Sequence, residues 1–201
     1  MTEPAAETAT PPRKAWFERA PINLGELAVE TIAVVIGILL ALAIDGWFDA
    51  RKDRETVDSA LQSIRAEIAR NREAALKHQR HLDAMAAAME RDNPADAAPR
   101  PCSAWKGWMG IQEPMLLDTS YNVAIVTQAL AKMPFAQASR IGEIYGGQHY
   151  VEKVYDKLGG ILLNDRPMQL ANCVGISREL SRGSGSLAER YQSLLQPTSP
   201  P

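Results

Sequence analysis

The feature that most constrains this chain is an apolar stretch close to the start of its sequence. Residues 27–44 read LAVETIAVVIGILLALAI, in which Glu30 is the single charged residue. Eighteen helical residues rise about 27 Å, which is close to the hydrocarbon thickness of a bilayer. The next residues, DGWF, are followed by charges, an order typical of a membrane boundary and not of a signal-peptide cleavage site. We therefore predict a transmembrane helix over residues 27–47, with membrane lipid around it.

The flanks of this helix predict little further structure at the chain ends. Trp16 and Phe17 stand among basic residues, so residues 16–26 are expected to form a lead-in that lies on the lipid headgroups. Residues 1–15 and 197–201 are rich in proline and small polar residues, and we expect both to be disordered tails.

Orientation depends on two weak signals. Three basic residues flank each side of the helix, so the positive-inside rule gives almost a tie: Arg13, Lys14 and Arg19 before it, and Arg51, Lys52 and Arg54 after it. Cys102 and Cys173 lie in separate segments after the helix, and a disulfide between them would need an oxidising compartment such as a periplasm. The alternative is two reduced, buried thiols. We predict a cytoplasmic N-terminus and a periplasmic domain.

After the membrane helix, the pattern predicts an all-α domain. Residues 51–91 contain no glycine or proline, and they predict a long juxtamembrane helix that continues from the transmembrane helix. A stripe with alternating spacings of three and four runs along it: Val57, Leu61, Ile64, Ile68, Asn71, Ala75, His78, Leu82, Met85 and Met89. Two interpretations are open: packing within the chain's own helical bundle, or self-association as a coiled coil.

The rest of the chain is expected to complete this domain. Three prolines between residues 92 and 110 block a helix there, so this segment is predicted to be a linker. Residues 111–196 show helical periodicity and no clean alternation of period two, which predicts helices that pack against residues 51–91. The Gly183-Ser184-Gly185 sequence predicts a break before a last short helix.

Residues 25–47, GELAVETIAVVIGILLALAIDGW, resemble the opening of a group of uncharacterised bacterial single-pass inner-membrane proteins. The shared pattern is an acidic residue, a V-V-I-G-I-L stretch, a polar residue and a tryptophan, matched here by Glu30, residues 34–42, Asp45 and Trp47. Members usually carry asparagine near the tryptophan, where this chain has Asp45 and Gly46. The resemblance implies an inner-membrane location and a helical domain after the anchor, but no activity.

The sequence carries no recognisable catalytic or cofactor motif. There is no phosphate loop, H-E-x-x-H, C-x-x-C or G-x-S-x-G pattern, and the net charge of −2 gives no attraction to nucleic acid. We therefore expect no cofactor, no metal and no enzymatic activity. Tyr145, His149 and Glu152 lie around a double glycine and could line a small-molecule pocket, or an enzyme site of unrecognised type. The alternative is a packed helix junction.

The transmembrane helix itself offers a candidate contact face. Glu30, Ala33, Gly37, Ala41 and Asp45 fall within a sector of about 120° at 100° per residue. Small residues four apart let two membrane helices approach closely, and acidic residues are costly against lipid. The alternative is that both acids merely sit at the two interfaces.

These patterns favour a non-enzymatic, membrane-anchored accessory or scaffold subunit. It would associate with another integral membrane protein, or with itself as a homo-oligomer, through the Gly37 face. The alternative function is an extracytoplasmic helical-bundle sensor that binds a ligand and works with a separate signalling partner.

Overall fold

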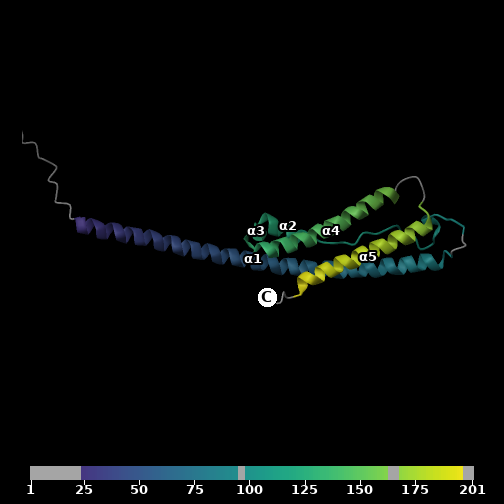
Figure 1. The fold of residues 1–201 in the computed structure, drawn as a ribbon, viewed down its shortest axis with the longest axis horizontal. Coiled ribbons are helices and arrows are strands. Elements are labelled where there is room, and N and C mark those ends of the chain that lie inside the picture. Colours follow the sequence, from purple (N-terminus) through teal and green to yellow (C-terminus); the bar gives the residue numbers. More distant parts are fainter. Residues whose placement is uncertain (1–23, 95–97, 163–167, 197–201) are drawn as a thin grey trace, which may run out of the picture. The chain divides into compact units, whose positions relative to one another are not determined.

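The computed structural model describes residues 24–94, 98–162 and 168–196, and the chain divides into two compact units at Ala50 (Figure 1). The described residues form five α-helices and one short 3-10 helix, with no strand, so the predicted all-α fold class is confirmed. The predicted tails, and residues 16–23 of the predicted lead-in, lie outside the described residues.

The first unit consists of the apolar beginning of helix α1, whose bounds are Leu24–Arg91. By length and composition this is a helix able to cross a membrane. Every described side chain from Leu27 to Ala50 is exposed, because the described part of the unit supplies no second element to cover it. Gly46 does not interrupt the helix, so the predicted continuation of the apolar helix into residues 51–91 is observed.

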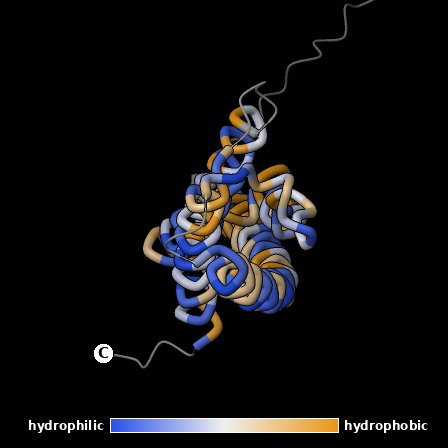
Figure 2. The backbone as a smooth tube through the Cα atoms, turned by 90° about the vertical axis from the view of Figure 1, so that its right-hand side faces the viewer, coloured by the Kyte–Doolittle hydropathy of each residue, from blue (hydrophilic) through white to orange (hydrophobic). Residues whose placement is uncertain are grey.

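The second unit is a helical bundle that contains residues 51–91 of α1. The 3-10 helix Cys102–Ala104 follows, and then come α2 (Thr119–Val126), α3 (Ala129–Lys132), α4 (Phe135–Leu162) and α5 (Leu170–Leu195). The two long helices α4 and α5 pack on α1 (Figure 1), and hydrophobic and hydrophilic positions alternate around the turns of these helices (Figure 2).

The stripe on α1 is buried inside this bundle. Eight of its positions are covered by the chain itself: Ile64, Ile68, Asn71, Ala75, His78, Leu82, Met85 and Met89. Val57 and Leu61 are half-buried at its beginning. Of the two interpretations of the stripe, the structure therefore shows intramolecular packing.

The bundle core consists of two apolar clusters that share α1, α4 and α5. The first gathers residues of all five helices, among them Ile64, Ile68, Ala129, Ile144 and Tyr191. The second lies further along α1 and includes Leu82, Met89, Tyr155, Leu170 and the two cysteines. Buried polar side chains of α1, such as Asn71 and His78, lie along the same stripe as these apolar residues.

The predicted break at Gly183–Gly185 is wrong, because α5 runs without interruption to Leu195. Gly185 serves close packing instead. A Cβ atom on Gly185 would lie 2.7 Å from Nε2 of Gln79, a residue of α1. Ser181 and Ser184 are also buried, and the Ser181 hydroxyl donates to Asp83 Oδ1 at 2.6 Å. Glycine within a helix is less favourable than alanine by about 1 kcal/mol, and the contact with α1 offsets this cost.

Candidate functional site

The candidate contact face lies on the uncovered part of α1. Glu30, Ala33, Gly37, Ala41 and Asp45 are all exposed on an unbroken helix, so their helical spacing places them on one side of it. No atom lies within 4 Å of the position that a Cβ of Gly37 would occupy. The face is therefore uncovered within the described part of the chain.

A disulfide fixes the segment that connects α1 to α2. The structure joins Cys102 to Cys173 of α5, with the two Cα atoms 6.4 Å apart. Backbone hydrogen bonds reinforce the contact on both sides: the Cys102 amide donates to the Met168 carbonyl, and the Leu170 amide to the Arg100 carbonyl, each at 2.9 Å. The described part of this segment therefore stays on the bundle although its only helix is the short 3-10 helix at Cys102–Ala104.

Asn71 holds the next part of the same segment. Its Nδ2 donates to the Leu117 carbonyl at 2.6 Å, and its Oδ1 accepts from the Leu117 amide at 2.9 Å. Nδ2 is also 3.1 Å from Gln148 Oε1, and that oxygen accepts from the Tyr191 hydroxyl at 2.8 Å. One buried layer thus joins α1, α4, α5 and the backbone at Leu117.

Glu67 forms a second buried polar contact, at the start of α2. Its carboxylate is 1% exposed, and it accepts from the Ser120 amide at 2.8 Å and from the Tyr145 hydroxyl at 2.6 Å. Asp118 occupies the N-cap position but makes no side-chain capping bond. A side chain from α1 thus accepts from an amide of the first turn of α2, which has no partner within the helix itself. The Tyr121 ring stacks on Tyr145, with centroids 4.4 Å apart.

The three residues of the predicted pocket lie around these contacts. Tyr145 is fully buried, and its burial together with the bond to Glu67 raises the pKa of its hydroxyl. Glu152 is half-buried and accepts from Gln148 Nε2 at 3.0 Å. His149 is half-exposed, with Nε2 3.4 Å from Asp118 Oδ2. The arrangement holds the α1–α2 connection in place, and a ligand role for these residues stays a prediction.

A third buried contact joins His78 of α1 to Tyr155 of α4. The His78 Nε2 is 2.6 Å from the Tyr155 hydroxyl oxygen. Burial, with a smaller contribution from the nearby His81, lowers the pKa of His78 to about 4. Burial raises the pKa of Tyr155 to about 12. At neutral pH both groups are therefore uncharged, and the contact is a hydrogen bond between a neutral imidazole and a neutral phenol.

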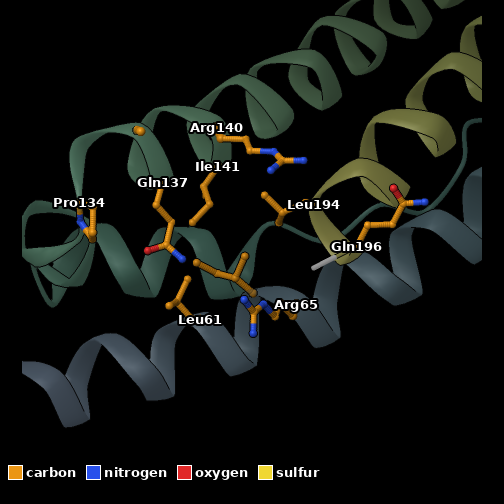
Figure 3. Close-up of a pocket in the computed structure, with 10 residues that line it drawn as sticks. Leu61, Arg65, Pro134, Gln137, Arg140, Ile141, Leu194 and Gln196 are labelled. Atoms are coloured by element: carbon orange, nitrogen blue, oxygen red, sulfur yellow. The ribbon is translucent and has the colours of Figure 1, made fainter. Parts of the chain in front are cut away.

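A pocket of about 470 Å³ opens among α1, α4 and α5 (Figure 3). Leu61, Ile141 and Leu194 contribute apolar walls, and Arg65 and Arg140 contribute guanidinium groups. The Arg140 Nη2 also donates to the Ser193 carbonyl. Apolar walls with two cations are suited to a small acidic molecule that has an apolar body. Among the residues that the structure describes, no group of three or more His, Cys, Asp or Glu could hold a metal ion.

Two of these buried polar residues, Glu67 and Gln148, are not identified from the sequence. Glu67 stands beside the stripe position Ile68 and looks like any solvated charge between apolar positions. Gln148 stands beside the predicted His149 and has no distinguishing pattern. Their role is visible only in the tertiary structure, because their partners lie 53 and 77 residues away in the sequence.

Comparison of the chain with known proteins identifies no relative. No family model, no curated protein and no solved structure matches the chain. The resemblance to bacterial single-pass inner-membrane proteins therefore stays a prediction.

Proposed function

We propose that this chain is a non-enzymatic accessory or scaffold subunit, anchored in a bacterial inner membrane by the first part of α1. In this proposal the helix associates with another integral membrane protein, or with a second copy, through the face around Gly37. The N-terminus lies in the cytoplasm and the helical bundle in the periplasm. Membrane lipid covers the remaining sides of the helix.

The observation that carries the proposal is the uncovered apolar helix with its small-residue ridge. The side chains from Leu27 to Ala50 have no cover within the described chain. Lipid can cover the branched residues, but Glu30 and Asp45 are costly against acyl chains. Gly37, with empty space over its Cα, lets a partner backbone come close, which favours helix association in membranes.

The location within the cell rests on a different feature. The Cys102–Cys173 disulfide supports a domain outside the cytoplasm, since cytosolic thiols are normally kept reduced. The basic residues on both flanks of the helix do not favour either orientation.

The test is to replace Gly37 with isoleucine and to purify the tagged full chain in a mild detergent. The matched control is Ala43→Ile, which adds a similar side chain about 120° away around the helix. We expect Gly37→Ile to lose the co-purifying membrane protein, or an untagged second copy of the chain, and Ala43→Ile to keep it. Equal recovery of partners with both variants would contradict the proposed face.

A ligand-binding sensor is the second candidate, and the 470 Å³ pocket is the observation that favours it. A sensor would be stabilised by its ligand, because a ligand that binds only the folded state shifts the unfolding equilibrium. Benzoate, an aromatic carboxylate, is a suitable first probe. A rise in the melting temperature of the full chain that Arg65→Ala abolishes would favour this function over the scaffold.

A further inference from the structure

The end of the bundle that contains α2 and α3 exposes an unusual number of apolar side chains. We call α2, α3 and the first residue of α4 the α2–α3 tip. Nine large hydrophobic side chains are exposed in the described part of the second unit, and four of them belong to this tip. They are Val123 (54% exposed), Ile125 (49%), Val126 (82%) and Phe135 (87%). The other five are scattered over the rest of the unit.

Helix α2 is apolar on several sides, although most of it lies on the surface. Of its eight residues, only Ala124 is buried. Thr119 and Asn122 are exposed as well, but Val123, Ile125 and Val126 make the rest of its exposed surface apolar, and such a surface is usually covered by protein or lipid. The tip is also firmly attached, because Glu67 holds the Ser120 amide and Tyr121 stacks on Tyr145. The exposure of these side chains is therefore a property of a fixed surface.

The chain length limits how far the tip can lie from the end of the apolar stretch. Lys132 of α3 forms an ion pair with Asp53, with Nζ and Oδ1 2.7 Å apart. Asp53 follows Trp47 by six residues, and six residues of even fully extended chain span about 22 Å. Val123 lines an open groove of about 430 Å³ together with Lys52, the fifth residue after Trp47. Covalent connectivity alone thus sets an upper limit on the separation of the tip from Trp47.

We infer that the α2–α3 tip docks on the interfacial region of the same phospholipid bilayer that holds the anchor. This inference rests on the membrane anchoring in the proposed function. Phenylalanine and branched aliphatic side chains enter the boundary between headgroups and acyl chains, while flanking lysine and arginine stay at the phosphates. Val126 and Phe135 are the side chains that enter the lipid, and Lys52 and Arg54 lie beside the headgroups.

The test measures how deeply labelled positions of the full chain lie in phospholipid vesicles. Single cysteines at Val126→Cys and Phe135→Cys carry an NBD fluorophore, and the two native cysteines are paired and do not react. Vesicles contain either a lipid with a nitroxide quencher close to the headgroup or no quencher. Val35→Cys reports on the anchor, and Ile161→Cys is an exposed control about 39 Å further along α4.

We expect lipid-borne quenching at positions 126 and 135 to be several-fold stronger than at position 161. Quenching at position 35 alone would overturn the docking inference and leave the anchor intact. No lipid quenching at any position would overturn the anchor and the proposed function together. Protection of positions 126 and 135 from aqueous iodide without lipid quenching would show that protein covers the tip, which also overturns the inference.

Discussion

Glu67 places a carboxylate in the domain core, where both of its oxygens have hydrogen-bond partners. Oε2 accepts from the Ser120 amide, and Oε1 accepts from the Tyr145 hydroxyl. A carboxylate suits this position because both partners are donors. An amide in its place would turn one acceptor into a donor, so the Tyr145 hydroxyl would accept from it and the proton of that hydroxyl would lose its acceptor.

We therefore expect Glu67→Gln to lower the free energy of unfolding by about 1–3 kcal/mol, the usual effect of one unpaired buried group. Urea unfolding of the full chain in mild detergent, followed by tryptophan fluorescence, measures this change. The control is Glu55→Gln on the exposed surface of α1, where a change within about 0.5 kcal/mol is expected. Equal stability of Glu67→Gln and the wild type would mean that the carboxylate is not needed.

His78 couples the stability of the domain to pH. Its pKa falls from 6.5 to about 4 on folding, so the unfolded chain binds more protons between these two values. The stabilisation is therefore complete above pH 6.5 and is lost as the pH falls towards 4. A shift of this size corresponds to about 3 kcal/mol.

The variant His78→Gln tests this coupling, because its amide oxygen can still accept from the Tyr155 hydroxyl. We expect the stability of the wild type to fall more steeply than that of His78→Gln between pH 6.5 and 4. Urea midpoints of the two full chains, measured across this range, give the difference. Parallel curves would show that another group carries the pH dependence.

Among the elements, the irregular connection from α1 to α2 depends most on tertiary contacts. The disulfide closes a loop between positions 71 residues apart. By the chain-entropy model, a loop of this length stabilises the folded state by about 4 kcal/mol. We expect the double variant Cys102→Ser, Cys173→Ser to lose stability of this order, as read from urea midpoints in detergent without reductant.

The state of these cysteines in intact cells provides the control. Cells are quenched with acid, and free thiols are then labelled with a PEG-maleimide in denaturant. If the two cysteines form a disulfide, the protein gains no PEG label before reduction and two PEG labels after it. Two additions without reductant would place the domain in a reducing compartment and contradict both the disulfide and the proposed location.

Helix α5 shows that helix propensity alone gives a wrong prediction of where a helix ends. Two glycines and a serine predict a break, but α5 continues through them, and Gly185 allows it to approach Gln79 of α1. A packing partner that lies about a hundred residues away cannot be recognised from local sequence. The stripe on α1, in contrast, is predicted residue by residue, because it depends only on helical periodicity and on which residues avoid water.

For the whole molecule, sequence reasoning predicts the fold class, the apolar helix and the buried face of α1. It does not predict how the connection between α1 and α2 is held, because Asn71, Gln148 and Glu67 act through backbone atoms far along the chain. The open face around Gly37 is visible in the sequence as small residues at helical spacing. The exposed tip of α2 and α3 is not, because local sequence cannot show which apolar residues remain uncovered.

The Asn71 layer has a consequence for how the bundle assembles. Apolar side chains tolerate several offsets between neighbouring helices, because hydrophobic contact is not directional. If α4 slid along α1 by one turn, Gln148 would move away from Asn71, and the amide and carbonyl of Leu117 would face a mismatched wall. Each stranded group costs about 1–3 kcal/mol. The layer therefore favours one register between the helices and destabilises shifted ones.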